Sequence, residues 1–466
     1  MSVPRDIHVL RVRPGHSPNC SAAGSVVGAA LLTAVGVAAV LNAFAGRLSA
    51  WRRDGDGGPP TGVDPSTETP PDPTPTDDTP RVRREAFGAI VAVNDPPALV
   101  SVDAESAQSL LDRGAREIGG GTSPAGALSA PTEAHIAVTD RCPVACDGCY
   151  LDAGPHRASP DPTATDLARD LDTLQAMGVF EVALGGGEVL VREDLAALIA
   201  SIRARGMVPN LTTSGLGLTT GMAAALAPHV GQVNVSLDGV DETYAAVRGW
   251  DGTRVALRAI ATLRDAGIRV GVNTVLSRKN VHALEAIGDA IAALGVSEWQ
   301  WVRFKPAGRG VDTYAEHALS QADGLSLWPR LLDIEARTGL IMRVDCALVP
   351  FLAAHGPTAD ALARLGVNGC VGGESLWARG ANGHWAPCSF AHASSVEDDR
   401  PLTERWQSDD VLDAWRARAA APPAPCDTCD HQRVCRGGCR IVAGHVTGDT
   451  LAPDPECPRV IAMAAL

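Results

Sequence analysis

The chain has 466 residues, enough for two or three domains, and its 45% hydrophobic content excludes a protein that is disordered throughout. Its 40 lysines and arginines are outnumbered by 54 aspartates and glutamates, and the net charge of -14 argues against nucleic acid as a partner. Twelve cysteines are too few for a disulfide scaffold of this length. Their clustering favours metal ligation in a reducing compartment.

Residues 1–53 are predicted to form an N-terminal extension with an uncharged apolar run at 22–46. The run is long enough to span a bilayer, so contact with a membrane is one interpretation. A basic start followed by Ala43-Phe44-Ala45 also resembles a cleaved secretory signal. Because the run is rich in Ala and Gly rather than Leu, its insertion is weak, and we favour an extension without membrane contact.

The next two segments are predicted to be a linker and a small folded extension. Residues 54–80 contain eight prolines, seven acidic residues and no basic residue, so we expect a disordered linker. Within 81–130, residues 87–93 and 98–103 alternate like two strands around a turn, and 104–114 follow as a short helix. This pattern weakly resembles the start of the peptide-recognition domains of peptide-modifying enzymes. An edge extension of a neighbouring catalytic sheet is the alternative.

Residues 131–345 are predicted to form an α/β core in which strand and helix patterns alternate. Six such units in succession predict parallel strands joined by right-handed crossovers, in either an open doubly wound sheet or a partial barrel. The expected strands are 134–139, 179–185, 208–214, 232–238, 269–276 and 298–304. From residue 346 to 466, loops, glycines and cysteines predict a small domain stapled by metal.

Cys142, Cys146 and Cys149 directly follow the first expected strand. Their loop therefore lies at the carboxyl end of a parallel sheet, where α/β sites form. A structural zinc site has four closed ligands. A [4Fe–4S] cluster, in contrast, can be held by three thiolates with one iron left open. The C-x3-C-x2-C spacing thus favours such a cluster over zinc or unliganded thiols.

This signature, with the aromatic Tyr150 beside the last cysteine, resembles that of the radical S-adenosylmethionine (SAM) enzymes. Gly186, Gly187 and Glu188 end the second expected strand and resemble the family's GGE motif, which implies contact with the methionine amino group of SAM. The glycines allow close approach of the backbone, and the carboxylate can pair with an ammonium group. The resemblance implies a partial (β/α)6 barrel of the TIM type.

Four later stretches resemble the same family. Ser214, in a TTSG sequence, stands near the place of the family's T-N-G stretch, and Ser236 and Asp238 belong to an S-x-D-G element whose serine contacts the cofactor. Residues 273–275 resemble the segment that lines the adenosine, and an RGW sequence beginning at Arg248 also matches. Arg258 is a candidate contact for the methionine carboxylate, with a solvated helical arginine as the alternative.

The resemblance also implies a mechanism. An electron that enters the cluster breaks a C–S bond of SAM, and the resulting 5′-deoxyadenosyl radical removes a hydrogen atom from the substrate. The cofactor carries the hard chemistry, and the protein supplies orientation and exclusion of water. We expect a reduced flavodoxin- or ferredoxin-like protein as the electron donor.

Seven further cysteines follow the pattern C-x12-G-x4-C, a gap, C-x2-C-x5-C-x3-C, a gap, and C. The pattern resembles the auxiliary-cluster domain called SPASM, with two zinc knuckles as the alternative. Family precedent implies two more [4Fe–4S] clusters, three in all. One is expected to be held by Cys426, Cys429, Cys435 and Cys457, and the other by Cys370, Cys388 and Cys439.

The fourth ligand of the second auxiliary cluster stays open at this stage. Cys346, a ligand other than cysteine, or the substrate would complete the cluster. Cys346 is equally plausible as a buried apolar thiol.

Enzymes with both auxiliary clusters include sulfatase activators and maturases that cross-link ribosomally made peptides through thioether or carbon–carbon bonds. Sulfatase activators carry an Asp after the second auxiliary cysteine, where this chain has Ser389. We therefore favour a peptide or protein substrate and maturation of a peptide.

Sulfatase-type maturation and biosynthesis of a tetrapyrrole or quinone cofactor are the alternatives within the enzymes. Outside the enzymes, the alternative is an iron–sulfur electron carrier or redox sensor, against which the SAM motifs argue. Oxygen-sensitive clusters favour the cytoplasm.

Overall fold

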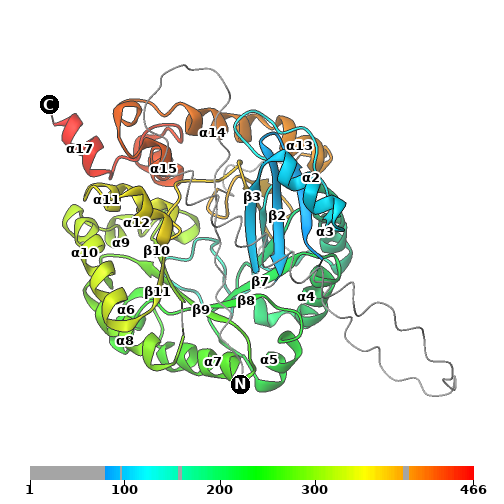
Figure 1. Ribbon diagram of the computed structural model, residues 1–466. Coiled ribbons are helices and arrows are strands. Elements are labelled where there is room, and N and C mark those ends of the chain that lie inside the picture. The colour runs from blue at the N-terminus through cyan, green and yellow to red at the C-terminus, as the bar shows by residue number, and fades with distance from the viewer. Residues whose placement is uncertain (1–78, 95–96, 156–159, 297, 392–397, 466) are drawn as a thin grey trace. The chain divides into compact units, whose positions relative to one another are not determined.

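A computed structural model describes residues 79–94, 97–155, 160–296, 298–391 and 398–465 (Figure 1). The predicted extension at 1–53, with its apolar run at 22–46, lies outside the described residues, as does nearly all of the predicted linker. Within the described ranges, no helix is both long and apolar enough to cross a membrane.

The first described segment forms a sheet of four strands in the order β3-β2-β1-β4. The predicted hairpin and helix are confirmed, because β2 and β3 pair antiparallel and α2 follows them. The sheet is separate from the larger one, so the alternative of an edge extension is wrong. Its elements are β1 (Arg81–Glu85), β2 (Gly88–Asn94), β3 (Pro97–Val102), α2 (Ala104–Asp112) and β4 (Arg116–Glu117).

Strand β1 was not predicted because its buried side chains are largely charged. Arg83 is fully buried, forms an ion pair of 2.8 Å with Glu85, and lies over the ring of Phe180, with its guanidinium carbon 4.9 Å from the ring centroid. Phe180 directly precedes a strand of the larger sheet. Buried charges that are paired in this way hide the apolar alternation by which a strand is recognised.

The larger sheet has nine strands in the order β11-β10-β9-β8-β7-β6-β5-β12-β13. All six predicted strands occur, each within two residues of its expected bounds, and each pairs in parallel with the next. They are β5 (Glu133–Ala137), β6 (Glu181–Gly185), β7 (Val208–Thr213), β8 (Gln232–Ser236), β9 (Val270–Leu276) and β10 (Glu298–Arg303).

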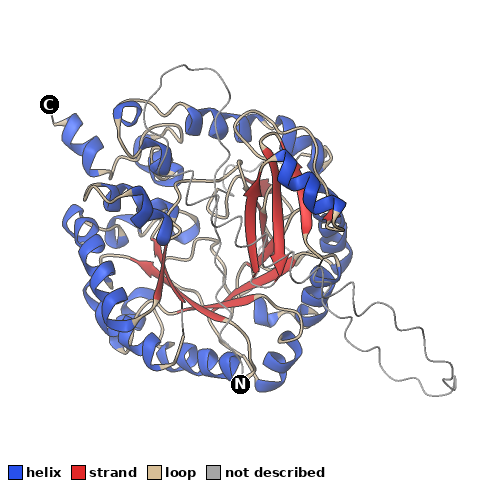
Figure 2. Ribbon diagram, in the orientation of Figure 1, coloured by secondary structure: helices blue, strands red, loops and turns tan. Residues whose placement is uncertain are grey.

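Side chains along these strands alternate between buried and half-buried positions. The buried ones, such as Val182 and Leu211, join one large apolar core. Figure 2 shows the helices on the outer side of the curved sheet. In a doubly wound sheet, helices would bury both faces. The sheet is therefore the partial barrel rather than the doubly wound alternative.

The helices between these strands supply the other half of the apolar core. Thr163 and Ser320 begin the two longest helices with capping boxes, in which the side chain accepts a hydrogen bond from the third helical N–H. The helical elements are α3 (Ala164–Met177), η1 (Val189–Val191), α4 (Leu195–Ala204), α5 (Thr220–Leu226), α6 (Glu242–Arg248), α7 (Thr253–Asp265), η2 (Val281–Ala283), α8 (Leu284–Ala293), η3 (Gly308–Val311), α9 (Tyr314–His317) and α10 (Gln321–Thr338).

The same sheet continues at both edges, with β11 just before the cysteine-rich segment and β12 within that segment. Strand β11 pairs in parallel with β10, and β12 pairs in parallel with β5. The sheet thus crosses the predicted domain boundary at residue 346. The elements are β11 (Ile341–Val344), η4 (Cys346–Leu348), α11 (Val349–Ala353), α12 (Ala359–Arg364), β12 (Leu376–Arg379), β13 (Trp385–Ala386), α13 (Leu402–Ser408), α14 (Asp410–Ala420), η6 (Cys426–Thr428), α15 (Gln432–Cys435), α16 (Arg440–Thr447) and α17 (Pro458–Ala464).

Candidate active site

The first cysteine loop follows β5 at the carboxyl edge of the sheet. Cys142, Cys146 and Cys149 are all free and half-buried. Burial raises the pKa of the Cys142 thiol to about 11, and the charges of the other two thiols act in the same direction. Gly148 lies against the ring of Phe304, since a Cβ there would be 2.4 Å from a ring carbon. The three predicted thiols thus lie in one loop and interact electrostatically.

Gly186 and Gly187 bind the end of β6 closely to the residues that precede Cys142. Gly186 has a φ of +127°, and a Cβ there would lie 2.3 Å from the carbonyl oxygen of Thr139. The N–H of Gly187 donates to the same carbonyl at 2.7 Å. A side chain at either position would separate the two backbones, which explains the pair of glycines.

The Glu188 carboxylate is buried and accepts four hydrogen bonds. One oxygen accepts from the Thr213 hydroxyl at 2.6 Å and from the N–H of Leu190 at 3.1 Å. The other accepts from the N–H and the hydroxyl of Ser214, at 2.8 and 2.5 Å. These donors fill the lone pairs of a carboxylate. Glu188 thereby ties β6 to β7 and places Ser214, and pairing with an ammonium would require a donor to move.

Asp238 links the end of β8 to β9 and is the charge partner of the largely buried Arg248. Its carboxylate accepts from the N–H of Val275 at 2.7 Å and forms an ion pair of 2.6 Å with Arg248. Burial opposes the charge of Arg248, but Asp238 raises its pKa above the ordinary value. Ser236 lies half-buried at the end of the same strand, with Asn273 as its partner on β9.

The two arginines of this region lie in different surroundings. Arg258 is exposed on α7, whose opposite face supplies Ala256, Ala259 and Leu263 to the core. An exposed position favours the solvated alternative for Arg258. The side chain of Arg248, at the end of α6, is only 16% exposed. In the sequence, only the RGW stretch that begins at Arg248 marked this residue as a candidate.

Several buried polar atoms around Asp238 have no hydrogen-bond partner among the described residues. They are Asn273 Oδ1, the Tyr244 hydroxyl and both ring nitrogens of His317. Tyr244 lies beside Arg248, whose guanidinium carbon is 5.7 Å from its ring centroid, and His317 stacks on Phe304 with centroids 4.5 Å apart. Buried polar atoms are rarely left unpaired in a complete structure. These atoms therefore fit a polar ligand such as SAM.

The C-terminal cysteines form two groups of interacting thiols. In the first, burial raises the pKa of Cys426 to about 11, and the charges of Cys457 and Cys429 add to the effect. Burial also raises the pKa of Cys435, and Cys457 and Cys426 again contribute. These four thiols are the set that the resemblance assigns to one cluster.

In the second group, burial raises the pKa of Cys388 to about 12, and Cys370 and Cys439 act in the same direction. Burial likewise raises the pKa of Cys346 well above the ordinary value, and the same two thiols contribute. Cys346, which the sequence left unassigned, thus interacts with two of the other three thiols. Within the described part of the chain, no three His, Cys, Asp or Glu side chains are placed to hold a single metal ion.

Residues beside these thiols contact the barrel. The ammonium group of Lys305, which follows β10, donates to Asp345 at 2.5 Å and lies 4.1 Å from the centroid of the Phe390 ring. Ser389 is within hydrogen-bond distance of His135 on β5, with 2.8 Å between Oγ and Nδ1. Sequence reasoning missed Lys305 and His135, because nothing local marks a residue whose partners are distant in the chain.

Comparison with known proteins gives matches over most of the chain. The family described as the radical SAM superfamily matches residues 136–290. Mycofactocin maturase MftC of Mycolicibacterium smegmatis is 30% identical over 341 residues, covering 71% of this chain and 83% of that protein. PqqA peptide cyclase of Ruegeria pomeroyi is 29% identical over 73% of this chain and 90% of that protein. The AdoMet-dependent heme synthase of Nitratidesulfovibrio vulgaris is 26% identical over 69% of this chain and 90% of that protein.

Solved structures share the fold at lower identity. Streptococcus suis SuiB bound to the precursor peptide SuiA matches with a TM-score of 0.63 and 16% identity, covering 82% of this chain and 98% of SuiB. The protein anSMEcpe with bound AdoMet matches with a TM-score of 0.55 and 15% identity, covering 72% of this chain and 99% of that chain.

Proposed function

The chain belongs to the radical SAM superfamily, and we propose that it is a maturase that modifies a ribosomally made peptide through a thioether or carbon–carbon bond. The observation that carries this proposal is the 30% identity to a mycofactocin maturase along most of both chains. A relative named as a PqqA peptide cyclase supports the same substrate class.

In this proposal, Cys142, Cys146 and Cys149 hold a [4Fe–4S] cluster. When bound, the cluster and SAM supply radical chemistry that removes a hydrogen atom from the substrate. The backbone at Gly186 and Gly187 would lie beside SAM, and Glu188 fixes Ser214 there by accepting two hydrogen bonds from it.

The other end of the proposed SAM site is formed by Ser236, Asp238 and Arg248. The unpaired atoms of Asn273, Tyr244 and His317 are available to the cofactor. Arg258 is left out of the proposed site because it is exposed.

The C-terminal thiols fit two auxiliary [4Fe–4S] clusters. Cys426, Cys429, Cys435 and Cys457 hold one of them. Cys370, Cys388 and Cys439 hold the other, with Cys346 as the fourth thiolate, because its charge interacts with those of Cys370 and Cys439. Four thiolates per auxiliary cluster leave the first cluster as the one with an open iron.

Two other functions remain as alternatives within the family. The relative named as a heme synthase favours tetrapyrrole chemistry as the second candidate. A sulfatase-type activity is disfavoured, because Ser389, a hydrogen-bond partner of His135, stands where the carboxylate is expected. We propose the cytoplasm as the compartment and a reduced flavodoxin- or ferredoxin-like protein as the donor.

The test begins with anaerobic purification, cluster reconstitution, and counts of iron and sulfide. About twelve iron per chain are expected from three four-iron clusters. SAM and a strong reductant should then yield 5′-deoxyadenosine. Co-expression with short peptides encoded beside the gene should produce one whose mass falls by two hydrogen atoms. Zinc in place of iron, with no SAM cleavage, would overturn the proposal.

A further inference from the structure

Arg303, the last residue of β10, lies where three cysteine-bearing segments meet. Its side chain is 2% exposed. One guanidinium nitrogen donates to the carbonyl of Ala347, directly after Cys346, at 2.9 Å. Another donates to Glu456, directly before Cys457, at 2.8 Å. A single barrel residue thus contacts segments that belong to both groups of C-terminal thiols.

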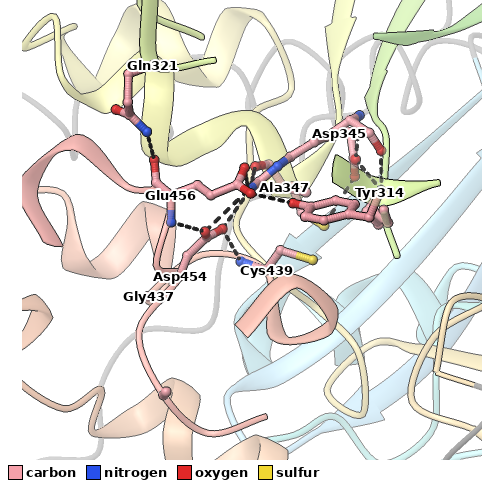
Figure 3. Close-up of polar contacts among 12 residues, drawn as sticks. Tyr314, Gln321, Asp345, Ala347, Gly437, Cys439, Asp454 and Glu456 are labelled. Atoms are coloured by element: carbon pink, nitrogen blue, oxygen red, sulfur yellow. Dashed lines mark hydrogen bonds and ion pairs between the residues drawn. The ribbon is translucent and has the colours of Figure 1, made fainter. Parts of the chain in front are cut away.

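Asp454 connects the same arginine to a third cysteine. Its carboxylate is fully buried and accepts from Arg303 at 2.6 Å. The same oxygen accepts from the backbone N–H of Cys439 at 3.0 Å, and Figure 3 shows this contact beside the one to Glu456. The N–H of Asp454 in turn donates to Gly437 at 3.0 Å. Asp454 therefore fixes the backbone on which the Cys439 thiol stands.

Glu456, the second carboxylate partner of Arg303, is itself held by two further hydrogen bonds. The Tyr314 hydroxyl donates to its carboxylate at 2.7 Å, and Gln321 donates to its carbonyl at 2.7 Å (Figure 3). The guanidinium of Arg303 offsets the charges of both carboxylates. Removal of the arginine would leave two carboxylates, one fully buried and one partly buried, without their counter-charge, which is strongly unfavourable.

We propose that Arg303 and Asp454 are positioning residues for both auxiliary clusters. Arg303 holds the Cys346 and Cys457 segments through its donors, and Asp454 holds Cys439. Cys346 and Cys439 belong to one proposed cluster and Cys457 to the other, so one ion pair anchors ligands of two clusters to the barrel. The inference rests on the two auxiliary clusters of the proposed function.

The test uses the full chain with Cys142, Cys146 and Cys149 replaced by Ala, so that only auxiliary clusters are counted. This parent should bind about eight iron per chain. Adding Arg303→Met should remove more than half of them, whereas adding Cys388→Ala should remove about four, the content of one cluster. If the parent binds no iron, the proposed auxiliary clusters are wrong. If it binds about eight, any loss of iron in the Arg303 variant tests the role of Arg303 alone.

A matched control comes from Arg379, another buried arginine with a carboxylate partner, Asp170, at 2.5 Å. Within the described residues, the hydrogen bonds of Arg379 reach Asp170 and Gly380, neither of which is next to a cysteine, so Arg379→Met should keep about eight iron. Circular dichroism reports whether each variant folds. Equal iron in the two Met variants, or a loss limited to one cluster, would overturn the proposal.

If Arg303→Met does not fold, Arg303→Lys provides the second test of the positioning role of Arg303. A lysine keeps the charge but cannot reach Ala347, Asp454 and Glu456 together, as the planar fork of arginine does. It should therefore fold and still lose iron from both clusters, seen as weaker signals of both in electron paramagnetic resonance of the reduced protein. Full retention of both signals would overturn the proposal.

Discussion

The ring of Tyr150, next to Cys149, packs against the ring of Phe390, two residues after Cys388, with centroids 4.9 Å apart. The Lys305 ammonium lies over the same Phe390 ring. Two segments that carry proposed ligands of different clusters thus meet through an aromatic pair. We expect Phe390→Leu, which keeps apolar volume but loses the ring, to lower the free energy of unfolding by about 1 kcal/mol.

The measurement is thermal unfolding of the metal-free protein under argon. Phe390→Ala should destabilise more than Phe390→Leu, because it also leaves a cavity. Equal unfolding midpoints for the parent and both variants would show that the aromatic contact contributes nothing to stability.

The six central strands were predictable because their outward side chains alternate with inward ones at the period of a strand. Strand β1 was not, since buried Arg83 and Glu85 pair with each other. The three cysteines of the first loop were found by their spacing alone. The contact between Arg303 and Asp454 spans 151 residues of sequence, and no local pattern reports a partner at that distance. Cys346 became a candidate ligand only through its interaction with Cys370 and Cys439, which are distant in the sequence.

Gly186 should tolerate no side chain. With a φ of +127° and a backbone oxygen 2.3 Å from a built Cβ, Gly186→Ala must open the contact between β6 and the first cysteine loop. We expect it to destabilise the protein by more than about 2 kcal/mol and to weaken SAM binding at least tenfold. Chemical denaturation and equilibrium dialysis with SAM measure the two effects.

Gly217 is the matched control for this substitution. It also has a positive φ, +84°, but nothing lies within 4 Å of a built Cβ. Gly217→Ala should therefore cost only the backbone strain of about 1 kcal/mol and leave SAM affinity unchanged. The same loss of SAM affinity in both variants would mean that strain, and not contact with the loop, is responsible.

The first cysteine loop should be required for SAM cleavage, and the C-terminal thiols only for formation of the modified peptide. Replacing any one of Cys142, Cys146 or Cys149 by Ala should abolish formation of 5′-deoxyadenosine, because the cluster loses one of its three thiolates. Cys435→Ala should spare SAM cleavage and impair formation of the modified peptide. Chromatography of the nucleoside products measures cleavage. SAM cleavage in a Cys146→Ala variant would exclude the assigned cluster.

Cys346 should behave as a cluster ligand and not as an apolar core residue. Cys346→Ala, made in the chain whose first three cysteines are already Ala, should lower the iron count by as much as four from about eight. Cys346→Ser should retain more iron than Cys346→Ala, since an alkoxide can replace a thiolate. An unchanged iron count and an unchanged electron paramagnetic resonance spectrum in the Ala variant would show that Cys346 is a buried apolar thiol and not a cluster ligand.

Stability of the metal-free protein should fall as the pH rises from about 9 to 11. Burial raises the pKa of Cys142, Cys426 and Cys439 to about 11, above the ordinary value of about 9. Between these pH values the unfolded chain has lost the thiol protons and the folded chain still holds them. Because the folded state then binds more protons, the free energy of unfolding decreases with pH. Below pH 9 both states are protonated and this slope vanishes.

The slope can be assigned by removing one buried thiol. Burial raises the pKa of Cys388 to about 12, so this thiol gives the clearest comparison. Cys388→Ser should flatten the decrease, since serine does not titrate in this range, while the difference between parent and variant stays constant below pH 9. Thermal unfolding of both proteins at a series of pH values, with a chelator under argon, measures this. Parallel curves from pH 8 to 11 would show that the Cys388 thiol is not shielded from water.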